Sequence, residues 1–519
     1  MKTIYLFFVI VALQLNTAFT QPTIVWGDCF GGAGADRPSS VKHTIDGGII
    51  ASGVTHSNNG DITSLNGNSD GWVIKINSEG TIDWQKTYGT SGLDNANEVL
   101  QTTDGGYIFA GFAFYNDGDA SGHHGGGSDF WVVKLNASGA IMWQKCYGGS
   151  AVDYACFIQP TNDNGYVIAG IGGSPDGDMT GFQGLSDFWI VKIDSVGTME
   201  WQKSIGGTSV DDANCIKQTN DGGYIIAGST ESVNGDVVNN HGASDFWIVK
   251  LNSTGNVEWM KCLGGSSIDL AKKIIQTNDG GYMVVGNTQS NDGNVTGNHG
   301  LTDAWIVKLT STGNIEWQKC MGGDGQDYAE DLIQLNDGGI IFVGYSYSLN
   351  GDLTANQGGT DCWIVKINSS GTMQWQKSYG STNNDRGYSL DIGSDGGLIV
   401  ANYTEGFNGD VSGSNGWADF WIVRFSSVQN LDQIQNELID ISLFPNPTLD
   451  YLNIKSQIMP ENKTLTYTIY DLLGKKIMEE TIESNPVLSL NIQEINTGYY
   501  FLNIKFDDLV LHKSFQKIK

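Results

Sequence analysis

The chain has 519 residues, 70 of them Gly and only 8 Pro, and its formal net charge is -29. Such a length accommodates two or three domains, and the glycine excess without a tripeptide period indicates many tight turns between short strands. Residues 21–442 carry 19 Lys and Arg against 48 Asp and Glu, so the negative charge is concentrated there. Because such a field repels nucleic acid and anionic lipid, we expect no nucleic-acid partner.

Residues 1–20 are predicted to be a signal peptide. Lys2 precedes an apolar run over residues 4–13, and the segment 18–20 supplies small residues for cleavage before Gln21. The run is too short for a permanent membrane anchor, and no other stretch approaches 18 apolar residues. We therefore expect an exported protein without a transmembrane segment.

A unit of about 58 residues then recurs seven times, up to residue 425. Each copy has an Asp-Gly turn followed by a strand that contains a Trp, and both markers keep the same step. A repeat of this length is one supersecondary unit that buries its faces against its neighbours. The turn aspartates are Asp46, Asp104, Asp163, Asp221, Asp279, Asp337 and Asp395, and the tryptophans are Trp72, Trp131, Trp189, Trp247, Trp305, Trp363 and Trp421.

Each unit divides into four strand-like segments, which in the fourth copy are 214–218, 224–229, 246–252 and 257–263. The first two are joined by a turn at Asp221-Gly222, a strong hairpin signal because Gly tolerates the positive φ that the turn requires. Runs such as Phe-Trp-Ile-Val are apolar on both alternating faces, as expected of sheets packed between other sheets. A four-stranded sheet repeated seven times with both faces buried is typical of a β-propeller blade.

The two ends of the repeat array complement each other. The seventh unit stops after its third strand, 420–425, and its missing fourth strand matches residues 23–32, where Trp26 corresponds to Trp317 of the fifth unit. An open solenoid would carry polar capping repeats at both ends instead. The sequence therefore predicts an all-β fold: a seven-bladed β-propeller over residues 21–425, closed by a 3+1 strand exchange, which we expect to be monomeric.

In a propeller the long loops, such as 230–244, share one face with the blade-to-blade crossings, such as 264–269, and the short hairpins lie on the other. Long loops on a rigid scaffold are common binding elements, so the long-loop face is the candidate binding surface. Thirteen of the 19 basic residues recur at fixed strand positions and are predicted to be structural. Few remain for the loops, so we expect this face to be acidic.

One aspartate recurs in every blade-to-blade crossing, just before the innermost strand. The repeat places these carboxylates near the mouth of the axial channel, where they are candidates for binding a cation or a sugar. The alternative is that each accepts backbone N–H bonds from its own turn, since a residue present in every repeat more often serves the repeat. These residues are Asp36, Asp94, Asp153, Asp211, Asp269, Asp327 and Asp385.

The long loops share an Asn-Gly-Asp or Asp-Gly-Asp motif, from which the fifth copy departs with Asp292-Gly293-Asn294. Clustered carboxylates and amides suit calcium, which takes six to eight oxygen ligands, and calcium is the one candidate cofactor. The spacing matches no known calcium loop, and a turn motif is the alternative interpretation. The candidate ligands are Asp61, Asp119, Asp178, Asp236, Asp352 and Asp410.

Signatures of catalysis are scarce. The chain contains no Gly-x-Ser-x-Gly, His-Glu-x-x-His, P-loop or dinucleotide fingerprint. His124, His241 and His299 hold similar loop positions in three repeats, which suggests shared turn geometry more than a metal site. No carboxylate outside the repeated positions stands out, but a glycosidase pair among the many carboxylates stays open.

From residue 443 the glycine-rich repeat gives way to strand-like runs with period-2 alternation, which predict a small β-sandwich over residues 443–519 after a linker at 426–442. Three blocks, Phe-Pro-Asn-Pro, Tyr-Asp-Leu-Leu-Gly-Lys and Gly-Tyr-Tyr-Phe-Leu, precede a basic end. In this order they resemble the C-terminal sorting domain of the type IX secretion system. The motif residues are Pro445, Asn446, Pro447, Asp471, Gly474, Lys475, Gly498 and Tyr499.

The resemblance implies a cargo that crosses the outer membrane through the type IX secretion machinery and becomes secreted or attached to the outer cell surface. The seven repeats also look like the Gly/Trp-rich propeller repeats of such cargo, a family without a settled activity. We therefore expect a binding or adhesion module for a glycan or an extracellular protein. The alternatives are a polysaccharide-active hydrolase or lyase with an axial pocket, and a structural component of a surface matrix.

Overall fold

The computed structural model describes residues 21–428, 442–444, 448–455, 464–471, 475–483, 487–506 and 509–518. Within them every regular element is a β-strand, and they form two compact units that meet in sequence at residues 426 and 427. The described residues contain no helix long and apolar enough to cross a membrane. The predicted signal peptide and residues 429–441 of the predicted linker lie outside the described residues.

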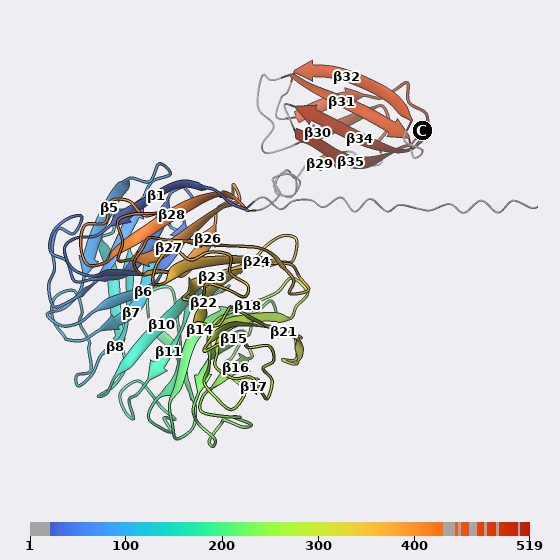
Figure 1. Cartoon of the computed structure of the whole chain (residues 1–519). Coiled ribbons are helices and arrows are strands. Elements are labelled where there is room, and N and C mark those ends of the chain that lie inside the picture. Colours follow the sequence, from blue (N-terminus) through green and yellow to red (C-terminus); the bar gives the residue numbers. More distant parts are fainter. Residues whose placement is uncertain are drawn as a thin grey trace, which may run out of the picture. The chain divides into compact units, whose positions relative to one another are not determined.

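The first unit consists of seven four-stranded antiparallel sheets, arranged as the blades of a propeller (Figure 1). The first strand of each sheet contacts the first strands of both neighbouring sheets, and β26 against β2 completes the circle. These strands are therefore innermost and surround the axis. They are β2 (Asp36–His43), β6 (Asn95–Gln101), β10 (Asp153–Pro160), β14 (Asp211–Gln218), β18 (Asp269–Gln276), β22 (Asp327–Gln334) and β26 (Asp385–Ile392).

The two middle strands of each blade follow outward from the axis. The second strands are β3 (Ile49–Thr55), β7 (Tyr107–Ala113), β11 (Tyr166–Gly172), β15 (Tyr224–Thr230), β19 (Tyr282–Thr288), β23 (Ile340–Ser346) and β27 (Gly397–Thr404). The third strands are β4 (Asp70–Ile76), β8 (Asp129–Leu135), β12 (Asp187–Ile193), β16 (Asp245–Leu251), β20 (Asp303–Leu309), β24 (Asp361–Ile367) and β28 (Asp419–Ser427).

The outermost strands show how the ring is closed. Six blades take theirs from the same repeat, but the seventh takes β1 (Ile24–Phe30) from the N-terminal segment, which pairs antiparallel with β28. The seven-bladed propeller with a 3+1 strand exchange is thus confirmed. The other outermost strands are β5 (Ile82–Tyr88), β9 (Ile141–Tyr147), β13 (Met199–Ile205), β17 (Val257–Leu263), β21 (Ile315–Met321) and β25 (Met373–Tyr379).

The third strands form the core between blades. Six of the seven are buried along their whole length, and their tryptophans are 0% exposed. Trp247 packs against Phe188 of the preceding blade, with ring centroids 4.6 Å apart, and Trp305 packs in the same way on Phe246. Burying a large aromatic side chain of this kind contributes several kcal/mol, so one repeated residue fastens each blade to the next.

A repeated ion pair holds the short hairpins together. In the fourth blade Lys250, which is buried, lies 3.0 Å from Asp221 of the first turn and 3.0 Å from Glu258 of the outermost strand. Burial would raise the pKa of Asp221, but bonds from Thr219, Gly223 and Lys250 outweigh it and lower that pKa to about 2. The recurring strand lysines are therefore structural, as predicted for this position.

The second unit contains two small antiparallel sheets, β29-β30-β33 and β32-β31-β34-β35. Leu452 and Leu490 of the first sheet share one apolar cluster with Ile469 and Leu502 of the second, which is the packing expected of a small sandwich. The strands are β29 (Ser442–Phe444), β30 (Tyr451–Lys455), β31 (Thr464–Asp471), β32 (Lys476–Glu483), β33 (Val487–Asn491), β34 (Gly498–Phe506) and β35 (Leu509–Lys517).

Candidate functional site

The crossing aspartates are bound into their own turns. In the fourth blade Asp211 is 0% exposed, and its Oδ2 accepts bonds from Gly207 N at 2.7 Å and Ser232 Oγ at 2.8 Å. Its Oδ1 accepts a bond from Thr230 Oγ1 at the end of the second strand. None of the seven lines the axial cavity described below, and this geometry favours the structural alternative. The equally buried counterparts are Asp36, Asp94, Asp153, Asp269, Asp327 and Asp385.

A second set of buried aspartates, which the sequence reasoning did not single out, begins the third strands. In the fourth blade this residue is Asp245. Its Oδ2 accepts a bond from His241 N at 3.0 Å, while its Oδ1 is buried without a hydrogen-bond partner among the described residues. The same oxygen lacks a partner in all seven blades. The set is Asp70, Asp129, Asp187, Asp245, Asp303, Asp361 and Asp419, all 0% exposed.

The two sets of aspartates are close neighbours. A Cβ built on Gly206 would lie 2.3 Å from Asp187 Oδ1 and 2.9 Å from Asp211 Oδ2, so only glycine fits between the two carboxylates. Burial raises the pKa of Asp187 to about 6, and repulsion from Asp211 and Asp236 adds to this shift. Burial likewise raises the pKa of Asp70 and Asp361 to about 6. A buried pair of acidic side chains therefore lies at this boundary between neighbouring blades.

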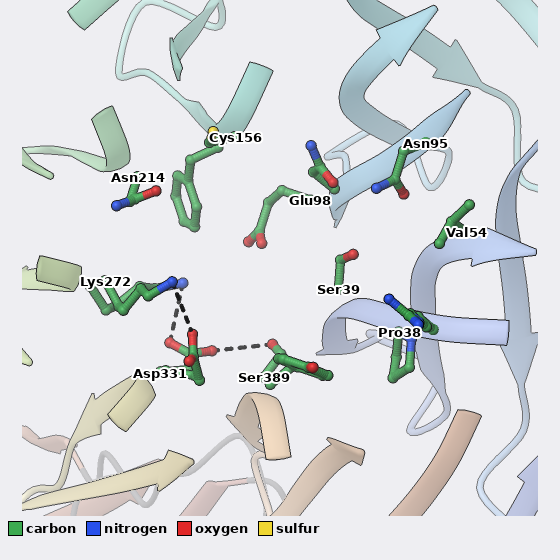
Figure 2. A pocket seen from close by; sticks show the side chains of 16 residues that line it. Pro38, Ser39, Val54, Asn95, Glu98, Cys156, Asn214, Lys272, Asp331 and Ser389 are labelled. Carbon is green, nitrogen blue, oxygen red and sulfur yellow. Dashed lines mark hydrogen bonds and ion pairs between the residues drawn. The ribbon is translucent and has the colours of Figure 1, made fainter. Parts of the chain in front are cut away.

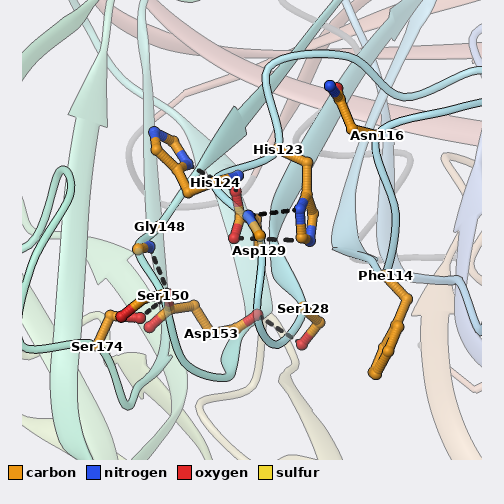
Figure 3. A network of polar contacts seen from close by, with 12 residues as sticks. Phe114, Asn116, His123, His124, Ser128, Asp129, Gly148, Ser150, Asp153 and Ser174 are labelled. Carbon is orange, nitrogen blue, oxygen red and sulfur yellow. Dashed lines mark hydrogen bonds and ion pairs between the residues drawn. The ribbon is translucent and has the colours of Figure 1, made fainter.

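The loop histidines belong to this arrangement. In the second blade His124 Nδ1 lies 2.7 Å from Asp129 Oδ2, and His123 lies on the other side of the same carboxylate (Figure 3). His241 and His299 make the equivalent contact at 2.6 and 2.7 Å in their own blades. The three histidines therefore lie on three separate blades, each beside its own aspartate, in agreement with shared turn geometry.

The loop motif joins the long loop to the crossing. Asp236 N donates to Gly206 O at 2.8 Å, and Gly206 N donates back to Asp236 Oδ2 at 3.3 Å. In the fifth blade Asn294 Oδ1 accepts the same bond from Gly264 N at 3.2 Å, so a neutral amide fills the role. Equivalent bonds are made by Asp61, Asp119, Asp178, Asp352 and Asp410.

Metal binding by these residues stays a prediction. Among the described residues, no group of three or more His, Cys, Asp or Glu side chains is arranged so that it could hold a metal ion. The long-loop carboxylates are instead each engaged by a backbone N–H of the crossing. The turn interpretation accounts for both the motif and its exception in the fifth blade.

The axial channel collects the residues that do not repeat. When the 13 recurring basic residues are set aside, six remain in residues 21–442, and every one lies on an innermost strand. Arg37 and Arg386 share one strand position and Lys42 and Lys217 share another, so each position is basic in at most two of the seven blades. A residue present in so few blades is not required by the blade fold. The six are Arg37, Lys42, Lys217, Lys272, Lys273 and Arg386.

A bulge in each innermost strand turns two consecutive side chains toward the axis, and Lys272 and Lys273 lie at one of these bulges. In β18 the register shifts between Ala271 and Lys273, so that two residues of β18 oppose one of β19. Consecutive side chains, which alternation would send to opposite faces, therefore both face the channel. They line a cavity of about 470 Å³ (Figure 2) in five pairs: Asn97 and Glu98, Cys156 and Phe157, Lys272 and Lys273, Glu330 and Asp331, and Tyr388 and Ser389.

Three ion pairs cross the cavity between neighbouring blades. Lys273 Nζ lies 3.1 Å from Asp331, Lys272 Nζ lies 3.7 Å from Glu330, and Lys42 Nζ lies 3.2 Å from Glu98. Ser389 Oγ also donates to Asp331 at 3.1 Å. Charges of both signs thus meet in a space enclosed by the blades, where they are weakly screened.

The two adjacent carboxylates of β22 have opposite pKa shifts. Burial raises the pKa of Glu330, and the pairing with Lys272 does not offset it. Burial acts in the same direction on Asp331, but Lys273 and Lys42 hold the pKa of Asp331 below its usual value. The sequence analysis found no non-repeated carboxylate that stood out, so this pair and Glu98 were missed.

Lys217 differs from the paired lysines. Its ammonium group lies 4.7 Å from the ring centre of Phe157, with Lys273 4.2 Å from the same ring. Among the described residues, no carboxylate lies within ion-pair distance of Lys217. Burial and the charge of Lys273 lower the pKa of Lys217.

The predicted sorting residues are only partly described. Asp471 ends β31, Lys475 directly precedes β32, and Gly498 and Tyr499 begin β34. Tyr499 is exposed and Tyr500 is buried in the core of the second unit. Pro445, Asn446, Pro447 and Gly474 lie outside the described residues.

Comparison with protein families finds a match to the secretion system C-terminal sorting domain over residues 442–518. This segment is the type IX sorting domain that the motifs predicted, and it indicates a protein that is secreted or attached to the outer cell surface. Comparison with curated proteins found no match.

Among solved structures, a variant of the Synechocystis apocarotenoid oxygenase is 13% identical with a TM-score of 0.37, covering 75% of this chain and 89% of its own. Puromycin hydrolase is 9% identical with a TM-score of 0.43, covering 83% and 61%. A glycoside hydrolase of family 32 from Bifidobacterium adolescentis is 8% identical with a TM-score of 0.24, covering 95% and 96%. At this level of likeness nothing follows about activity or ligand.

Proposed function

We propose that this exported protein is a binding module that takes a small polar ligand, such as the end of a glycan chain, into the axial channel of its propeller. One observation carries the proposal: all six basic residues outside the recurring positions lie on the innermost strands, and three of them, Arg37, Lys272 and Lys273, line one cavity. A residue that serves every blade must recur, whereas a ligand on the axis meets seven different strands. The long-loop face then surrounds the entrance.

The lining suits a ligand with many hydroxyl groups. Asn95, Asn97 and Asn214 contribute amides, Ser39 contributes a hydroxyl, and Phe157 contributes an aromatic ring. Asn95 Oδ1 is buried without a hydrogen-bond partner among the described residues, so it can accept a bond from a ligand at no cost of breaking another. A cavity of about 470 Å³ is within the usual range of small-molecule sites.

A glycan array probed with the purified protein tests the proposal, with two matched double variants. Lys272→Gln with Glu330→Gln neutralises a channel ion pair without changing net charge, and we expect it to weaken binding at least tenfold. Asp236→Asn with Asp352→Asn changes the long-loop face and should leave binding within about twofold. The reverse order of effects would contradict the channel site, and no binding to any glycan would contradict the glycan proposal.

A second candidate function is polysaccharide cleavage, favoured by the opposite pKa shifts of Glu330 and Asp331. General acid–base cleavage of a glycosidic bond uses two carboxyl groups whose pKa values are shifted apart in one cavity. We expect Glu330→Gln to abolish the release of reducing ends from any polysaccharide that the protein cleaves. If bound polysaccharides stay intact with the unaltered protein over long incubation, the binding function alone stands.

A further inference from the structure

Three of the six channel cations have no acidic partner among the described residues: Lys217, and at one end of the channel Arg37 and Arg386. The blade crossings and the long loops share one face, so the first residues of the innermost strands lie at that end of the channel. Arg37 and Arg386 are the second residues of the adjacent strands β2 and β26. Among the described residues, no carboxylate lies within ion-pair distance of either guanidinium, although the protein has a net charge of -29.

Tyrosine rings hold both guanidinium groups in place. The Arg37 guanidinium lies 5.3 Å from the ring centre of Tyr403, and that of Arg386 lies 6.0 Å from the same ring and 5.3 Å from the ring of Tyr345. Contacts of this kind use the flat face of the guanidinium and leave its N–H edges available. We call Arg37, Arg386, Tyr345 and Tyr403 the arginine–tyrosine wall.

The hydrogen bonds of the wall leave donors to spare. Arg386 Nη2 donates to Tyr347 OH at 3.3 Å, and its Nε is buried without a hydrogen-bond partner among the described residues. The nearest acidic side chain in the hydrogen-bond network, Glu405, is already engaged by Tyr403 OH at 2.6 Å and by Asn384 Nδ2 at 2.7 Å. Buried donors of a charged group are costly to leave unpaired, so the wall is built to receive an acceptor.

Two acidic side chains on other innermost strands are already engaged, although Glu330 lies near enough to Arg386 for the arginine charge to act on it. Glu330 on β22 is paired with Lys272, and Asp212 on β14 accepts a bond from Ser186 Oγ at 2.8 Å. Since β14 is three blades away from both β2 and β26, Asp212 lies on the opposite side of the axis from the two arginines. Such a separation of the charges orients a ligand that carries charge at one end only.

We propose that the arginine–tyrosine wall binds an oxyanion, a carboxylate or a sulfate, carried by the sugar that enters the channel. The inference rests on the proposed glycan-binding function and narrows it to acidic glycans. Arginine pairs with oxyanions through two parallel N–H bonds, and two arginines beside one ring offer donors from both sides. The cavity amides then bind the hydroxyl groups of the same ligand.

Calorimetry with the full chain and three trisaccharides of equal length tests this: a uronic acid oligomer, a sulfated oligomer and a neutral oligomer. We expect an acidic oligomer to bind at least tenfold more tightly than the neutral one, and the tighter of the two acidic probes identifies the oxyanion. Arg37→Gln with Arg386→Gln should remove this preference. Lys86→Gln with Lys203→Gln, which changes the net charge equally on outermost strands, should preserve it.

The outcomes separate this inference from the proposed function. Equal binding of acidic and neutral oligomers, unchanged in the arginine double variant, would overturn the wall as an oxyanion site while the glycan site stands. Binding of none of the three oligomers, together with binding of a tripeptide that has a free carboxylate, would overturn both, because the channel would then recognise peptide ends. Circular dichroism of each variant confirms that the fold is retained.

Discussion

The recurring residues of each blade and the channel-facing residues of the innermost strands differ in one respect: the first are nearly identical in seven copies, and the second differ in almost every copy. Asp211 and Trp247 have counterparts in every blade, and their contacts lie within a blade or between neighbours. Lys272 and Glu330 have no counterparts, and they pair with each other between neighbouring innermost strands at the channel. Residues that recur in every blade therefore stabilise the propeller fold, whereas residues that do not recur line its channel.

The largest expected effect on stability is at the recurring tryptophan of the third strand. Trp247→Ala removes a fully buried side chain that packs on Phe188, and we expect a loss of about 3–5 kcal/mol in the free energy of unfolding. Ser39→Ala, which changes a cavity-lining hydroxyl, should stay within about 0.5 kcal/mol. Chemical denaturation of both variants measures the difference, and equal losses would erase the distinction between the two classes.

The crossing aspartate should have the next largest effect. Asp211→Ala leaves the N–H of Gly207 and the hydroxyls of Thr230 and Ser232 without their acceptor, and an unsatisfied buried donor costs about 1–3 kcal/mol. The adjacent Asp212→Ala is the matched control, since that side chain is only partly buried and accepts one bond from Ser186. The melting temperature of Asp211→Ala should be well below that of Asp212→Ala. A higher melting temperature for Asp211→Ala would argue for a ligand role of the crossing aspartate.

The buried third-strand aspartates predict greater stability in mild acid. Because the folded-state pKa of Asp70, Asp187 and Asp361 is raised to about 6, the native protein binds protons more tightly than the unfolded chain. Stability should rise as pH falls from about 7 towards 4, until hairpin carboxylates such as Asp221, with a pKa of about 2, begin to be protonated.

Melting temperatures measured between pH 8 and pH 3 test this slope. Asp187→Asn, which resembles the protonated side chain, should flatten part of the slope and stabilise the protein at pH 7.5. Asp236→Asn, which removes only the repulsion that Asp236 adds to the pKa shift of Asp187, should flatten the slope less than Asp187→Asn does. A melting temperature that falls steadily below pH 7 would contradict the prediction.

The smallest effect is expected at the loop motif. Since Asn294 already makes the bond that Asp236 makes, Asp236→Asn and Asn294→Asp should each change stability by less than about 0.5 kcal/mol. Melting with calcium and with chelator decides the metal question. A calcium-dependent rise that disappears in Asp236→Asn would favour the metal interpretation over the turn.

The propeller architecture could be predicted from the sequence because the same pattern of strands and turns occurs in seven copies. The strands, the short hairpins and the closing strand at Trp26 all follow from periodicity and turn chemistry. The site was missed for a specific reason: at Lys272-Lys273 and Glu330-Asp331 a bulge directs neighbouring residues to the same side, against the period-2 rule. The signal was nevertheless present, since subtracting the recurring lysines from the total leaves six basic residues, all on innermost strands.

The closing strand has a consequence for the order of assembly. β1 pairs with β28, which lies about 390 residues further along the chain, so this contact has the largest loop-closure entropy of any strand pair in the propeller. Six blades can form from contiguous segments of the chain while β1 is still unpaired. The seventh blade is complete only when β28 has formed and pairs with β1. The ring is therefore closed by its most distant strand pair, which forms on the outside of the seventh blade and away from the channel.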